Sequence, residues 1–244
     1  AFRAEDKNEY LRHYFEYWQR LTNHDTRTQL FQPDTWSKVE GQHSFDAFNQ
    51  VLTASDNLSF GTAEDHIANA LYFESKTFLH GLFIVGDKLS MAHGLEERFP
   101  FLDNDLVDFA QKLPIKHKLS DLHYMLNISE DELRKKKLAK EQYSGGKSVL
   151  RKAMEGLLPK QITNRAKQGF SSPDESWFRG ENADYVRETL LHGDLASSEY
   201  INPTFVHKIV KEHIESGVNH RLLIWSLLSF EWWCRLFLND SGYE

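Results

Sequence analysis

Apolar residues return every three or four positions along most of the chain, whereas strict alternation of apolar and polar residues is rare. This spacing places apolar side chains on one face of a helix, so the chain is predicted to be mainly α. Clear stripes run over 10–21 and 45–52. Thr62 and Asp65 have the spacing of a capping box, which predicts a helix that begins there and continues through Phe78.

Three further helices are predicted from their ends and their apolar content. Asp103 is expected to cap one that ends before Pro114. Its buried side is expected to carry Leu106, Val107, Ala110 and Leu113. The other two cover 147–158 and about 221–238, and the last is apolar almost all round, as expected of a core helix. No parallel strands are evident, so we expect a single helical region over 1–244.

Residues 127–146 are polar and lysine-rich and end in two glycines, which predicts a mobile loop. The sequence SGGKS over 144–148 is not a P-loop, because Glu141 stands where that motif needs glycine. Two interpretations stay open. The glycines form a turn that caps the next helix, or a flexible loop brings Lys147 to an anionic ligand.

Composition places the chain among ordinary globular proteins, with 40% hydrophobic and 27% charged residues. It begins at Ala1 and shows neither a secretory leader nor an apolar run long enough for a membrane span, so we expect a cytoplasmic piece of a longer protein with no membrane contact. The single cysteine, Cys234, lies in an apolar run and is expected to be structural. The histidines lack zinc-protease spacing, so no metal site is predicted from protein ligands alone.

Charge is distributed unevenly along the chain. The formal net charge is −7, which argues against nucleic-acid binding, yet 134–167 carries a net +9. Within this basic island, the segment NRAKQGF over 164–170 places Arg165 and Lys167 just before a glycine. Arginine offers a fixed fork for phosphate oxygens and lysine a mobile point charge. With Lys147 they form either a clamp for a polyphosphate or a set of solvated surface cations.

Residues 87–98 have an unusual density of polar groups between apolar runs. Asp87 and Glu96 are candidates for a base, a ligand of metal-bound water or a lysine partner. The alternative, which we favour for Glu96 and Arg98, is an internal ion pair that holds the turn.

Four segments together resemble the synthetase domain of glutamine-dependent asparagine synthetases and their relatives, in sequence, order and spacing. They are LYFESKTFL (71–79), DKLSMAHGLEERFPFLD (87–103), KSVLRKA (147–153) and LLPKQITNRAKQGF (157–170). The second and fourth are the most specific, and the resemblance covers roughly 65–240. It implies the helical C-terminal portion of an adenine-nucleotide α-hydrolase-like (ATP pyrophosphatase) α/β domain, whose parallel-sheet part is absent from this chain.

The family activates a carboxylate such as aspartate with ATP, releases pyrophosphate, and transfers ammonia from a glutaminase domain to the acyl carbon. The resemblance implies that Lys167 is the catalytic lysine and that Lys147 holds the departing pyrophosphate. Arg165 is the second candidate for binding ATP or pyrophosphate. Asp87 matches a polar position that lines the site, and in lactam-forming relatives a carboxylate near here helps to activate the amine. Glu96 is a further position that lines the site or holds its structure.

The family's Ser-Gly-Gly-x-Asp-Ser loop, its Ser-Gly-Glu-Gly-x-Asp-Glu segment and its glutaminase with a leading cysteine are missing from this sequence. The expected partners are therefore the upstream ATP-binding and glutaminase parts, and ATP and Mg²⁺ are expected to bind mainly outside this chain. A homodimer is compatible with the resemblance. Asparagine synthesis from aspartate is the first hypothesis. An amidotransferase or a lactam-forming or peptide-cyclising relative, and a non-catalytic helical interaction module, are the alternatives.

Overall fold

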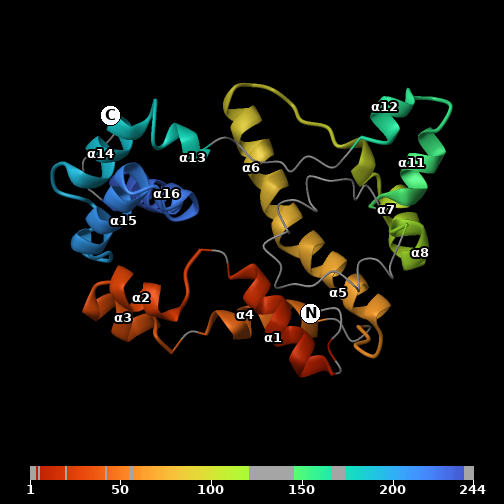
Figure 1. Ribbon diagram of the computed structural model, residues 1–244, viewed down its shortest axis with the longest axis horizontal. Coiled ribbons are helices and arrows are strands. Elements are labelled where there is room, and N and C mark those ends of the chain that lie inside the picture. The colour runs from red at the N-terminus through yellow and green to blue at the C-terminus, as the bar shows by residue number, and fades with distance from the viewer. Residues whose placement is uncertain are drawn as a thin grey trace. The chain divides into compact units, whose positions relative to one another are not determined.

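The computed structural model describes residues 4, 6–19, 21–41, 43–54, 58–120, 146–165 and 174–238. These residues are mainly helical, as predicted, and their β-type pairing is limited to isolated bridges (Figure 1). The chain divides into two compact units: unit 1, Ala1–Tyr14 and Ala47–Gly169, and unit 2, Phe15–Asp46 and Phe170–Glu244. The predicted single helical region is thus described below as two bodies, and the predicted loop at 127–146 lies almost wholly outside the described residues.

Unit 1 has its core where α1, α4 and α5 meet. The helices of this unit are α1 (Lys7–Trp18, which extends beyond the unit), α4 (Ser44–Thr53, which begins before it), α5 (Ala63–Lys76), α6 (Phe78–Ala92), the 3₁₀ helix η1 (Pro100–Leu102), α7 (Asn104–Lys112), α8 (Ile115–Lys118), α11 (Ser148–Met154) and α12 (Lys160–Thr163). The hydroxyl groups of Tyr10 and Tyr14 donate to the carbonyls of His66 (3.0 Å) and Ala70 (3.2 Å). These buried bonds fix α1 along α5, while the tyrosine rings supply apolar contact.

The predicted capping box at the start of α5 is confirmed. The Thr62 hydroxyl accepts from the Asp65 amide at 3.1 Å, and the Asp65 carboxylate accepts from the Thr62 amide at 2.9 Å. Hydrogen bonding to the Asp65 carboxylate, from the Thr62 side chain most of all and then from Ser59 and the Thr62 amide, lowers the pKa of this carboxyl group. The predicted continuation through Phe78 is interrupted at Thr77, where the backbone departs from helical angles and α6 begins next.

The prediction of a buried face on α7 is wrong. Asp103 caps this helix as expected, with its carboxylate accepting from the Leu106 amide at 3.1 Å, but none of its residues is buried. Helix α6 also has no buried residue, and its Leu89 and Val85 side chains are more than half exposed. An amphipathic pattern predicts a helix but leaves open what covers its apolar side, and exposed apolar patches of this kind are typical of interaction surfaces.

Unit 2 is built on α14, α15 and α16, which pack around one apolar cluster (Figure 1). Its helices are α2 (His24–Leu30), α3 (Pro33–Val39), α13 (Asp174–Trp177), α14 (Ala183–Leu191), α15 (Pro203–Glu215) and α16 (Arg221–Phe237). Val186, Val210 and Ile224 at its centre are fully buried, and burial of each such side chain stabilises the fold by roughly 1.5–3 kcal/mol. A bridge between Phe31 and Ile201 joins the end of α2 to the start of α15.

Helix α16 is buried on one face only, so the predicted burial almost all round is wrong. Leu223, Ile224 and Leu227 face the core, whereas Trp225 is 59% exposed and Trp233 is 48% exposed. Cys234 is free and fully buried, which agrees with a structural role. Burial, and then the nearby charge of Glu231, raise the pKa of its thiol.

A buried carboxylate ties α16 to the turn that follows α14. Glu231 is 0% exposed, and it accepts from the Ser197 hydroxyl (2.6 Å), the Ser197 amide (3.0 Å), the Ala196 amide (3.1 Å) and Arg235 Nε (2.7 Å). Burial alone would raise its pKa, but the four hydrogen bonds together lower it below the usual value. The group is thus held as an anion inside unit 2.

No helix among the described residues is both long enough and apolar enough to span a membrane.

Candidate phosphate-binding site

Lys147 stands at the N-cap of α11 with an unusual backbone. Its φ of 58° and ψ of 36° are left-handed, and it is the one residue other than glycine with positive φ in the described part of the chain. Its side chain is exposed, and its ammonium group makes no hydrogen bond or ion pair with any described residue. The turn thus presents an unpaired cation at a conformation that ordinary residues rarely adopt.

The turn around Lys147 is attached to α8. Gly146 pairs with Leu119 in an antiparallel bridge, and the buried Ser148 hydroxyl donates to the carbonyl of His117 at 2.6 Å. Gly146 and Lys147 thus form a turn directly before α11, whereas Gly145 and the predicted loop lie outside the described residues. Delivery of Lys147 to an anionic ligand stays a prediction.

The second basic segment begins at the end of α12. Pro159 precedes this helix, and Thr163, its last residue, is buried. Arg165 follows with an exposed side chain. Lys167, the predicted catalytic lysine, lies outside the described residues, so its role stays a prediction.

Arg151 joins the two basic segments, and sequence reasoning gave it no role. From α11 its Nε donates to the carbonyl of Gly146 at 3.1 Å, and its Nη1 donates to the carbonyls of Thr163 and, at 3.1 Å, of Arg165. The turn of Lys147 and the segment of Arg165 are thus brought to one place. In the sequence, Arg151 is one of eleven cations between 134 and 167, and this does not indicate a particular role.

The structure does not join Asp87, Glu96 or Arg98 to these cations. Asp87 is exposed on α6, and no hydrogen bond or ion pair in the described part of the chain links it to Lys147 or Arg165. Glu96 and Arg98 form an ion pair at 2.6 Å, but their side chains are 68% and 80% exposed. The pair therefore lies on the surface rather than inside, where such pairs contribute little stability.

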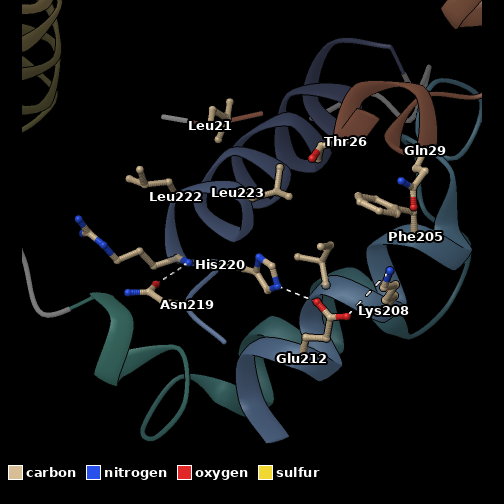
Figure 2. A pocket seen from close by; sticks show the side chains of 12 residues that line it. Leu21, Thr26, Gln29, Phe205, Lys208, Glu212, Asn219, His220, Leu222 and Leu223 are labelled. Carbon is tan, nitrogen blue, oxygen red and sulfur yellow. Dashed lines mark hydrogen bonds and ion pairs between the residues drawn. The ribbon is translucent and has the colours of Figure 1, made fainter. Parts of the chain in front are cut away.

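A pocket of about 440 Å³ lies within unit 2 (Figure 2). None of the candidate site residues described above lines it. Leu21, Phe205 and Leu223 contribute apolar walls. Its carboxylate, Glu212, lies 2.8 Å from the ring of His220 and 4.0 Å from the ammonium of Lys208. Because Glu212 already contacts both of these side chains and no predicted site residue lines the pocket, the pocket offers no support for phosphate binding.

Within the described ranges, no group of three histidine, cysteine, aspartate or glutamate side chains is arranged to hold a metal ion.

The asparagine synthase family model matches residues 2–235. The chain belongs to the asparagine synthase family. It is 30% identical over 163 residues to asparagine synthetase 1 of Bacillus subtilis, an alignment covering 66% of this chain and 22% of that protein. It is 26% identical over 179 residues to a putative asparagine synthetase of Mycobacterium bovis, covering 72% and 24%.

The chain is also similar to the amidase chry2 of Gibberella zeae, with 22% identity over 138 residues, an alignment that covers 56% of this chain and 18% of that protein. No solved structure matches the chain significantly. The chain thus spans between a fifth and a quarter of the length of these synthetase relatives.

The backbone at Lys147 gives a direct test of the local conformation. Glycine adopts left-handed angles without strain, so Lys147→Gly is expected to raise the free energy of unfolding by about 1 kcal/mol. Lys152→Gly, placed in the right-handed part of α11, is the matched control and is expected to lower it by roughly 0.5–1 kcal/mol. Urea denaturation measures both. A Lys147→Gly variant less stable than the wild type would contradict the left-handed turn.

Proposed function

We propose that this chain supplies the phosphate-handling helical part of an ATP-dependent synthetase that makes asparagine from aspartate and glutamine-derived ammonia. The single observation that carries the proposal is the family match over 2–235. Lys147 is exposed and its ammonium group has no partner among the described residues, and Arg151 links its turn to the backbone of Arg165. Both observations support the proposal, because two cationic segments lie close together. The parallel-sheet part, the ATP-binding part and the glutaminase part belong to the proposal as upstream partners.

In this reaction a carboxylate oxygen of aspartate attacks the α-phosphorus of ATP and pyrophosphate leaves. The ammonia nitrogen then attacks the acyl carbon and loses one proton to water, and AMP leaves with the electron pair of the broken acyl–oxygen bond. Lys147 is assigned to the charge that accumulates on the departing pyrophosphate, and Lys167 to the charge that develops during adenylation and acyl transfer. Neither role requires proton transfer, because a lysine ammonium stabilises an oxyanion by position and charge.

The remaining assignments follow the same chemistry. Arg165 is assigned to phosphate oxygens, for which its planar fork is suited. Asp87 is assigned to the lining of the carboxylate-substrate site, and Glu96 to the support of the turn through Arg98. The cationic side chains fit a triphosphate but not a magnesium ion, so the chain's own residues would hold phosphates while Mg²⁺ is held by carboxylates elsewhere. The cytoplasm is the proposed location.

A second candidate keeps the chemistry and changes the acceptor. One similar protein is named an amidase and not an asparagine synthetase, so similarity to this chain extends beyond proteins named for asparagine. The second candidate is therefore an amide-forming relative that acts on another carboxylate or amine, including lactam formation or peptide cyclisation. The acceptor depends on the shape of a pocket that includes partners of this chain. A non-catalytic helical interaction module is the third candidate, and it differs from the other two in its lack of response to nucleotide.

The test is a coupled product assay with the complete polypeptide encoded by the gene that contains this chain. The protein is incubated with ATP, Mg²⁺, aspartate, and either glutamine or ammonium. We expect asparagine, AMP and pyrophosphate in equal amounts. AMP and pyrophosphate formed with another carboxylate, but not with aspartate, would support the second candidate. Absence of any amide product, together with no ATP binding in isothermal titration, would overturn the enzymatic proposal and favour the interaction module.

A further inference from the structure

The Arg151 side chain contacts three backbone positions on two segments. Its donors reach the carbonyls of Gly146, Thr163 and Arg165. Gly146 immediately precedes Lys147, and Arg165 is itself one of the proposed phosphate ligands. One guanidinium group therefore connects the turn that carries the first cation with the backbone that carries the second.

These contacts differ from those of an ordinary surface arginine. No acidic side chain among the described residues pairs with Arg151, although Glu155 lies one helical turn further along α11. The arginine fork has five donors in a fixed plane, so several carbonyl acceptors also fix its own orientation. Arg151 is partly buried, so breaking these hydrogen bonds would leave guanidinium donors without acceptors, at a cost in free energy. This cost holds the three carbonyl groups in position.

The other contacts of the turn cannot replace this connection. The bridge from Gly146 to Leu119 and the hydrogen bond from Ser148 to His117 attach the turn to α8. Neither of these two contacts reaches α12 or the Arg165 segment. In the described part of unit 1, the Arg151 side chain is the group that hydrogen-bonds to both basic segments.

We propose that Arg151 is a positioning residue that fixes the separation of Lys147 from the Arg165 segment, so that both cations reach one polyphosphate together. This inference rests on the proposed function. The attraction between a cation and a phosphate falls with distance, and small displacements of groups that hold a substrate reduce rates severely. Loss of the Arg151 contacts would therefore act on ATP through Lys147, with Arg151 itself touching no substrate.

The first experiment compares Arg151→Ala and Arg151→Lys with Lys152→Ala in the complete, amide-forming protein. Lys152 is the neighbouring exposed cation on the same helix and serves as the control. We expect Arg151→Ala to lower kcat/KM for ATP about ten- to hundredfold, with the KM for aspartate unchanged. Arg151→Lys should lie between this variant and the wild type, because an ammonium group cannot span the same carbonyls. Lys152→Ala should change neither constant by more than about twofold.

A double-mutant cycle with Lys147→Ala separates positioning from general loss of structure. If Arg151 acts through Lys147, the Arg151→Ala/Lys147→Ala variant is no slower than Lys147→Ala alone. Effects that multiply, or an Arg151→Ala variant that behaves like Lys152→Ala, would overturn the inference. Circular dichroism monitors folding, and Arg151→Lys replaces the alanine variant in the cycle if that variant does not fold. A wild-type protein without ATP-dependent amide formation would instead overturn the proposed function, and this inference with it.

Discussion

Replacement of Lys167 by alanine is expected to lower kcat for amide formation about 100- to 1,000-fold. Removal of one group that stabilises developing charge in a transition state typically has an effect of this size. The KM values for aspartate and ATP should change much less, because the proposed interaction is stronger in the transition state than in the enzyme–substrate complex. Steady-state assay of asparagine and pyrophosphate release measures both constants. Arginine at this position keeps the charge but not its location, so Lys167→Arg should recover only part of the rate.

Lys160→Ala is the matched control for this prediction. Lys160 is an exposed cation in the same basic island, at the start of α12, and has no proposed role. Its replacement should leave kcat within about twofold of the wild-type value. If Lys167→Ala formed amide at the wild-type rate, the family assignment of this lysine would fail. If Lys160→Ala were as slow as Lys167→Ala, the island would act through its total charge and not through one residue.

Replacement of Glu231 by alanine is expected to lower the free energy of unfolding of unit 2 by about 3–5 kcal/mol. Removal of one partner from a buried ion pair leaves the other charge and its hydrogen-bonding groups unsatisfied. Here Arg235, the two amides of the turn and the Ser197 hydroxyl would lose their common acceptor. Native proteins are stable by about 5–15 kcal/mol, so this change is a large share of the total.

Glu231→Gln tests the role of charge with little change in volume, and urea denaturation measures both variants. The glutamine amide keeps one acceptor oxygen, but its NH₂ group faces the N–H and O–H donors that the second carboxylate oxygen accepted from. We therefore expect the free energy of unfolding to fall by about 2 kcal/mol, less than in Glu231→Ala. Glu188→Gln, on the exposed side of α14, is the control and should change stability by less than about 0.5 kcal/mol. A Glu231→Gln variant as stable as the wild type would show that the carboxylate charge is dispensable.

The same carboxylate predicts a pH dependence of stability. Its pKa is lower in the folded chain than its usual value of 4.5. The folded state then favours the anion, so this contribution is fully present above pH 4.5 and is lost as pH falls through the depressed folded pKa. Wild-type protein should lose stability below about pH 4.5 more steeply than Glu231→Gln.

The sequence predicts part of the candidate site. Lys147 and Arg165 were singled out by charge and by resemblance, and the structure brings their backbones together. The left-handed angle at Lys147 was not foreseen, because a lysine gives no local signal for it. Arg151 was counted only as one charge among many, since its acceptors are backbone carbonyls up to 14 residues away.

By itself the sequence determined the mainly helical character, several helix starts, the basic island and the family of this protein. Capping residues such as Thr62 and Asp103 act on the backbone within three positions, so their effects can be read locally. The tertiary structure decided which apolar faces are buried, as α7 and the exposed Trp225 show. It also decided the acceptors of Arg151 and the donors to Glu231. Burial and hydrogen bonding of this kind depend on groups that are distant in the sequence and meet only when the chain is folded.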